Sequence, residues 1–226
     1  MATISINQLA EFSKATEKGK ARIIKQQIVP NPVLIPWYQL AKARLKKSIS
    51  QNWDLNPIYS GIELLKRRTQ FENNRQRIDQ KVSLEALESF LSTPSPLILQ
   101  SIEYERIIPD TKSLVLGNLE IIVAPDVVFR TEIDGQKYLG GFKIHVSKSK
   151  VFDLKQSSLV ATVLWKYLDR EVAREDEIVM PGLCFCYDVF SSRIVPGNED
   201  SIALLENIDI WSQEVIQIWD SLSQAG

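Results

Sequence analysis

The chain has 226 residues, of which 44% are hydrophobic and 24% are charged, and its formal net charge is −1. This composition predicts an ordinary soluble globular protein with one sizeable domain, or one domain and a smaller appendage. No apolar run approaches the roughly 20 residues that a membrane helix needs, and the N-terminus lacks the apolar core of an export signal, so we expect a cytoplasmic protein that makes no membrane contact.

The charge is distributed unevenly along the chain. Residues 1–82 contain 15 lysines and arginines against 6 acidic residues, whereas residues 83–226 contain 12 against 22. A basic segment joined to an acidic one suggests an anionic partner for the basic segment. The alternative is that these cations form a solvated helical surface or complement the acidic half of the same chain.

The first ninety residues have the pattern of helices. We expect helices over residues 6–28, 36–51 and 58–78, and a short helix over residues 84–91 that Ser83 caps. The proline-rich run at residues 30–36 separates the first two, because proline blocks helical hydrogen bonding and restrains its neighbours. Residues 1–82 are therefore predicted to form a basic helical region that precedes a core over residues 83–226.

Two short basic stretches within these helices are candidate nucleic-acid contacts, since lysine and arginine bind backbone phosphates. They comprise Lys42, Arg44, Lys46 and Lys47 in the second helix, and Lys66, Arg67 and Arg68 in the third. Trp37 and Tyr38 precede the first stretch and could stack on bases. Alternatively, these two aromatic residues seat their helix on the core.

From about residue 97 the hydrophobic period becomes that of strands. We expect strands over residues 97–108, 118–133, 136–148 and 181–195, with Asp134-Gly135 as a hairpin turn between the second and third. Residues 152–172 return to a helical period, and a final helix presents Trp211, Val215 and Trp219 along one stripe. This order predicts an α/β (α+β) fold in which helices flank a mixed central β-sheet.

The cysteines and the histidine limit the possible chemistries. Cys184 and Cys186 lie two residues apart in a strand-like run, where both thiols point to one face and suit two small buried hydrophobic groups. With only these cysteines and His145, a structural zinc cluster is excluded. A phosphate-binding glycine loop and the G-x-S-x-G motif of a serine hydrolase are also missing.

The segment APDVVFRTEIDGQKYLGGFKIHVSK, residues 124–148, carries the most specific pattern. Residues 97–190 resemble the PD-(D/E)XK nuclease superfamily, most closely its RecB-type branch. In that family an aspartate on the second strand and an acidic-x-lysine triplet on the third converge at one sheet edge. Pro125-Asp126 matches the first element, Gly141-Phe142-Lys143 falls where the triplet belongs, and Gln156 lies where the RecB-type branch often has a glutamine.

The resemblance implies a restriction-endonuclease-like core and a Mg²⁺-dependent hydrolysis of phosphodiesters, with Asp126, Lys143 and Gln156 as catalytic residues. The metal would polarise the phosphate and lower the pKa of the attacking water, and Lys143 would stabilise the developing negative charge. The departure from the family pattern is Gly141, which supplies no carboxylate to the metal. Asp126 with Lys143 can alternatively be a structural ion pair.

Other side chains are candidates for the missing ligand. Glu103 and Glu105 on the first strand resemble the region where some family members supply an auxiliary acid. Asp153 has the required charge but is equally suited to cap the following helix. His145 shares a strand face with Gly141 and Lys143, although imidazole is a poor ligand for magnesium. We therefore take Asp126, Asp153 and Glu105 as the candidate Mg²⁺ ligands.

The sequence leaves three functions open. The first is a degenerate RecB-type nuclease that acts on DNA with magnesium. The second is a catalytically inactive binding or structural subunit on the same scaffold, in a DNA-processing or defence assembly. The third is a protein-interaction module that touches no nucleic acid.

Overall fold

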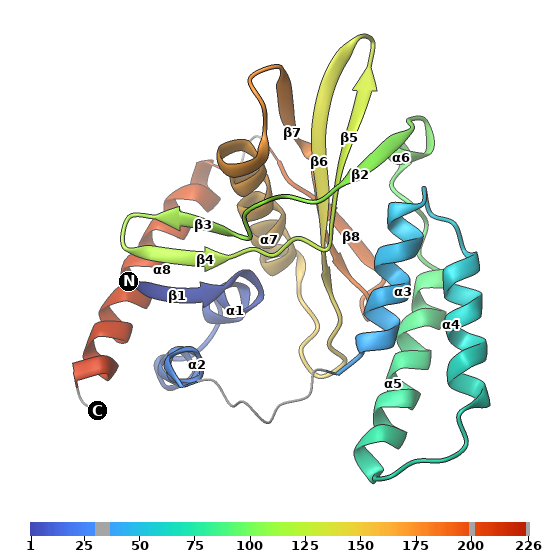
Figure 1. Ribbon diagram of the computed structural model, residues 1–226. Helices are drawn as coiled ribbons and strands as arrows, with labels where there is room; N and C mark the ends of the chain where they lie inside the picture. Colours follow the sequence, from blue (N-terminus) through green and yellow to red (C-terminus); the bar gives the residue numbers. More distant parts are fainter. Residues whose placement is uncertain (30–36, 199–201, 225–226) are drawn as a thin grey trace.

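The computed structural model describes residues 1–29, 37–198 and 202–224 and has a mixed α/β architecture built on two β-sheets (Figure 1). The larger sheet has five strands in the order β2-β5-β6-β7-β8, and the smaller has three in the order β1-β4-β3. The strands are β1 (Ala2–Ser5), β2 (Tyr104–Ile107), β3 (Ser113–Leu116), β4 (Leu119–Ile122), β5 (Val127–Ile133), β6 (Gln136–His145), β7 (Glu177–Asp188) and β8 (Arg193–Pro196). Within the larger sheet β6 and β7 run parallel and the other neighbours antiparallel.

Helices cover both faces of the five-stranded sheet. They are α1 (Ile6–Phe12), α2 (Glu17–Ile28), α3 (Gln39–Ser50), α4 (Asn56–Arg67), α5 (Asn74–Leu91), α6 (Leu97–Gln100), α7 (Leu154–Tyr167), the π-helical turn η1 (Leu168–Val172) and α8 (Ile202–Gln224). Figure 1 shows α3, α4 and α5 side by side on one side of this sheet, and α8 with the small sheet on the other. Helix α7 packs against β6 and β7 and also contacts α1, α8 and β3, so it lies between the two sheets.

The central strands are buried because both of their faces are covered. On the face toward α3–α5, Phe142 of β6 stacks on Phe185 of β7 with ring centroids 4.7 Å apart, and both belong to one hydrophobic cluster. On the face toward α7, Cys184 and Cys186 belong to a second cluster and are free, buried thiols. The prediction that both thiols share one face is confirmed.

The hairpin turn between β5 and β6 is also confirmed. Asp134 and Gly135 both have positive φ, 52° and 79°, and Ile133 pairs with Gln136 across the turn. These backbone angles are typical of the two-residue turns whose twist matches that of the flanking strands.

Three predicted strands are wrong in extent. Residues 118–133 are divided between β4 and β5, which belong to different sheets, because Pro125 and the positive φ of Ala124 (39°) break the strand. Residues 97–108 begin with the short helix α6 and only then form β2. The fourth predicted strand, residues 181–195, is a hairpin of β7 and β8, which turns near Ser192 with φ 49°.

The N-terminal helices also differ from the prediction. Residues 2–5 form β1, which pairs in parallel with β4, and Thr16 starts α2 as a separate helix by accepting a hydrogen bond from the Gly19 amide. Ser83 is not an N-cap but is buried within α5, whose N-cap is Asn73. The predicted division at residues 82 and 83 therefore falls inside α5, and the proline-rich break at 30–36 lies outside the described residues.

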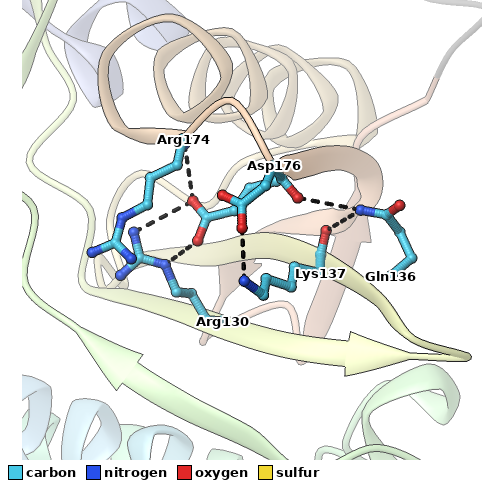
Figure 2. A network of polar contacts seen from close by, with 6 residues as sticks. Arg130, Gln136, Lys137, Arg174 and Asp176 are labelled. Atoms are coloured by element: carbon cyan, nitrogen blue, oxygen red, sulfur yellow. Dashed lines mark hydrogen bonds and ion pairs between the residues drawn. The ribbon is translucent and has the colours of Figure 1, made fainter.

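Ion pairs tie the hairpin end of the five-stranded sheet together (Figure 2). Arg130 of β5 pairs with Glu177 at the start of β7, and Lys137 of β6 pairs with Asp176 with 2.6 Å between Nζ and Oδ2. The Arg174 amide also donates to Glu177, at 3.0 Å. In the part of the chain that the structure describes, none of the helices is long and apolar enough to cross a membrane.

Candidate functional site

Asp126 lies at the opposite end of the sheet, where β5 begins and β6 ends. The backbone break at Ala124-Pro125 brings its side chain back onto β6, where Oδ2 accepts a hydrogen bond of 2.7 Å from the Ile144 amide. Its own amide donates to the Phe142 carbonyl at 2.8 Å. The carboxylate is consequently fixed and almost fully buried, with a side-chain exposure of 1%.

Two lysines of α3 pair with the other oxygen of this carboxylate. Lys42 and Lys46 are four residues apart and therefore share one face of the helix, and their Nζ atoms lie 3.1 and 2.7 Å from Oδ1 of Asp126. Burial raises the pKa of Asp126, but the charges of Lys42, Lys143 and Lys46 outweigh burial and hold that pKa below its usual value. Asp126 is therefore ionised at neutral pH.

Lys143 is buried in β6 behind this group. Its ammonium donates hydrogen bonds of 2.7 Å to the Val123 carbonyl and 2.8 Å to the Ala124 carbonyl. Burial lowers the pKa of Lys143 to about 8, although the nearby charge of Asp126 opposes this effect. Lys143 and Asp126 are thus close enough to influence each other's charge, but the ammonium is bonded to the strand-breaking segment rather than to the carboxylate.

Gly141 leaves no room for the acid that the nuclease pattern requires. A Cβ atom at this position would lie 2.9 Å from the Val127 carbonyl oxygen and 3.3 Å from a methyl group of Leu168. The first of these neighbours is backbone and cannot move aside cheaply. A carboxylate here would force β5 and β6 apart, so the glycine is required by packing.

Asp153 and Gln156 cap α7. The Asp153 side chain accepts from the Gln156 amide at 2.9 Å, and the Gln156 side chain accepts from the Asp153 amide at 3.2 Å. Asp153 also pairs with Lys14, and Gln156 Nε2 donates to the Ala10 carbonyl at 2.9 Å. Both side chains therefore fasten α7 to the N-terminal segment.

Glu105 lies far from Asp126 along the sheet. In the register of β2 and β5, Glu105 lies opposite Arg130. Asp126 precedes β5 by one residue, so about 13 Å of strand separates the positions of Glu105 and Asp126. Glu105 lines a hollow with Glu103, Glu132 and Glu177 at the hairpin end. The structure does not bring Glu105 and Asp126 together.

His145 supports the loop that follows β6. Its ring stacks on Phe152 with centroids 3.6 Å apart, and Nε2 lies 2.6 Å from the Lys150 carbonyl. Burial lowers the pKa of His145, which favours the neutral ring as a donor to that carbonyl. Its contacts are those of a packing residue.

The donor set does not fit Mg²⁺. Magnesium needs hard oxygen ligands in near-octahedral geometry, but one oxygen of Asp126 faces two ammonium groups and the other accepts an amide proton. Among the described residues, no group of three His, Cys, Asp or Glu side chains is placed to hold a metal ion.

The cations of the two predicted basic stretches have different contacts. Lys42 and Lys46 face Asp126, and the stem of Arg44 packs close to Gly61. Arg67 pairs with Glu63, and Arg68 bonds to Gln76 and lies over the Phe71 ring. The remaining two, Lys47 and Lys66, are exposed.

The two aromatic residues before α3 also differ from each other. Tyr38 packs edge-on against Phe190, with ring centroids 5.8 Å apart, as expected of a residue that seats its helix. Trp37 is 41% exposed and carries the Arg75 guanidinium over its ring at 5.0 Å.

A cleft of about 220 Å³ opens beside Asp126. Its charged lining consists of Asp126, Lys46, Arg106 from β2 and Lys112 from the β2–β3 loop, next to Ala124 and Pro125. Arg106 and Lys112 were missed by the sequence analysis. They are isolated cations in an exposed strand and a loop. The pairing of β2 with β5 places Arg106 near Asp126, and the Lys112 carbonyl accepts hydrogen bonds from the Val123 and Ala124 amides.

Comparison with known proteins gives no assignment. No protein family model matches the chain, and no curated protein is significantly similar to it in sequence.

Proposed function

We propose that this protein binds nucleic acid, with DNA as the expected form, on a nuclease-like, restriction-endonuclease-like scaffold, and that it does not hydrolyse it. The observation that carries the proposal is the pairing of Asp126 with Lys42 and Lys46, at 3.1 and 2.7 Å. In a PD-(D/E)XK-like site, the metal would neutralise this carboxylate. Here two ammonium groups supply that positive charge.

The packing around Gly141 supports the same proposal. A metal-dependent nuclease needs a second acidic ligand beside its lysine, and a Cβ atom at residue 141 would already contact the Val127 backbone at 2.9 Å. The other candidate ligands are engaged elsewhere, since Asp153 caps α7 and Glu105 lies at the hairpin end. The arrangement favours binding over cleavage.

The test measures binding and cleavage on the same preparations. The full chain should bind a fluorescent DNA oligonucleotide in EDTA, and the affinity should fall steeply with salt, because each neutralised phosphate releases counterions. With Mg²⁺ or Mn²⁺ added, single- and double-stranded DNA and RNA should stay intact over hours.

Two results would contradict the proposal. Metal-dependent cleavage that Asp126→Asn removes, with an unchanged circular dichroism spectrum, would show that the protein is a nuclease. Failure to bind DNA or RNA at low salt would instead favour a protein-interaction module.

A further inference from the structure

The charges around Asp126 do not balance. One carboxylate faces the ammonium groups of Lys42 and Lys46, and Arg106 and Lys112 line the same cleft. Within the described residues, Asp126 is the one acidic side chain in that lining. The three cations of the lining together with Lys42 outnumber Asp126 by three positive charges, before Lys143 behind it is counted.

Such a surplus is unfavourable unless a further anion shares the site. The lysines already repel one another, since the charges of Lys42 and Lys46 contribute to the lowered pKa of Lys143. Like charges this close are tolerated where they serve a ligand, as in sites that bind phosphate. The arrangement therefore has the electrostatics of an anion-binding site.

The geometry favours a phosphate group over a carboxylate as the anion. Arg106 lies on the edge strand β2, Lys112 on the loop between β2 and β3, and Lys46 on helix α3, so three different elements supply the cations of the cleft. An arginine presents a planar fork to phosphate oxygens, and lysines add point charges from other directions. The tetrahedral arrangement of phosphate oxygens suits donors that converge from several sides.

We propose that this cleft binds a phosphate group without a metal ion, held by Lys46, Arg106 and Lys112, with Asp126 positioning Lys42 and Lys46. This inference rests on the proposed function and identifies the part of the nucleic acid that the site holds. The same chemistry is offered by a free or organic phosphate, so the experiment separates the two sources. Asp126 is a positioning residue here, because its own oxygens are bonded to the protein.

The test uses Arg106→Gln with Lys112→Gln in the full chain, in EDTA. Both side chains are exposed at the cleft, and among the described residues neither has an ion-pair partner, so the double variant should fold normally. The matched control is Lys155→Gln with Lys18→Gln, which removes the same charge from exposed positions on α7 and α2. The probes are inorganic phosphate and a short oligothymidylate.

The cleft variant should bind oligothymidylate at least tenfold more weakly than the wild type, and the control within about twofold, because removing phosphate contacts weakens binding and reduces its salt dependence. Burial lowers the pKa of Lys143 to about 8, and inorganic phosphate should raise this pKa in an NMR titration of the wild type. A nearby anion stabilises the protonated amine, and this readout does not depend on nucleic acid.

The outcomes separate the inference from the proposed function. If oligothymidylate binds and the cleft variant weakens it no more than the control, the phosphate cleft is wrong and nucleic-acid binding stands. If phosphate raises the pKa of Lys143 but neither oligothymidylate nor the DNA and RNA probes of the previous test bind at low salt, the cleft is supported and the proposed function is overturned. If phosphate leaves that pKa unchanged and both variants bind alike, the inference fails.

Discussion

The two ends of the five-stranded sheet carry ionic groups on the same strands, but in opposite arrangements. At the hairpin end, Arg130 and Lys137 each have an acidic partner in Glu177 and Asp176 (Figure 2), and further glutamates surround them. At the other end, Asp126 is outnumbered by lysines and by the arginine of the cleft.

The paired charges at the hairpin end can be purely structural, whereas the excess of cations at the Asp126 end is what the proposed anion would neutralise. At the hairpin end, Arg130 and Lys137 each have their own acidic partner, so these two pairs can hold strands together without any further group. At the Asp126 end, the protein itself supplies too few negative charges. Under the proposed function, the anionic partner is therefore expected at the Asp126 end of the sheet, and both ends can contribute to stability.

The largest effect should follow from removing both lysines of α3. Lys42→Met with Lys46→Met removes both ion pairs of the buried Asp126 carboxylate and leaves only the more distant charge of Lys143, and the free energy of unfolding at pH 7 should fall by about 3 kcal/mol. The full cost of breaking a buried pair is higher, but the lysine side chains are 35% and 39% exposed. Urea denaturation measures the change.

The pH dependence sharpens this prediction. In the wild type the folded-state pKa of Asp126 is lowered. The ionised carboxylate therefore contributes its full stabilisation above the unfolded-state pKa, and this contribution is lost as the pH falls through the folded-state pKa. Without the two lysines, burial should raise the pKa of Asp126. Protonation at acidic pH should then remove the free-energy cost of burying its charge. The difference between variant and wild type should therefore shrink below about pH 4. Lys47→Met, exposed on the same helix, is the control and should leave stability nearly unchanged.

A smaller loss should follow at the hairpin end. Arg130→Met deprives Glu177, whose side chain is 2% exposed, of its cation, and should lower the free energy of unfolding by about 2 kcal/mol. The exposed pair of Lys137 with Asp176 provides the control, since Lys137→Met should not shift the urea midpoint. Phosphate binding should be unaffected in both variants. A loss of binding in Arg130→Met alone would remove the distinction between the two ends.

The smallest effect concerns Gly141. Gly141→Ala should lower stability by about 1–2 kcal/mol, because the added methyl group meets the Val127 backbone. Gly182→Ala is the matched control on the neighbouring strand, where an added Cβ would come no closer than 4.0 Å to the Met180 sulfur. Equal thermal midpoints for the two variants would mean that residue 141 has space for a side chain, and the argument against a second acidic ligand would fail.

Much of the fold follows from local sequence signals. The Asp134-Gly135 turn, the strand on either side of it and helix α7 could be predicted, because turn geometry and hydrophobic period depend on neighbouring residues. The division of residues 118–133 into two sheets was missed although Pro125 was visible. A proline can end a strand or merely begin one, and only the partners of β4 and β5 decide which.

The candidate site shows the same limit more clearly. Asp126, Lys143 and Gly141 could be selected from their spacing in one segment, and their positions on neighbouring strands β5 and β6 followed from the hairpin. Lys42 and Lys46 were selected as phosphate contacts, since a basic run gives no sign of an acidic partner about 80 residues away. Arg106 and Lys112 have no sequence signal at all.

By itself, the sequence determined the hairpin of β5 and β6, helix α7 and which thiols share a face, because these depend on contacts between residues close in the chain. The tertiary structure alone decided that the carboxylate of Asp126 is neutralised by α3 and surrounded by further cations. Electrostatic energy depends on distance in space rather than along the chain, and the packing of α3 and β2 around the start of β5 sets those distances.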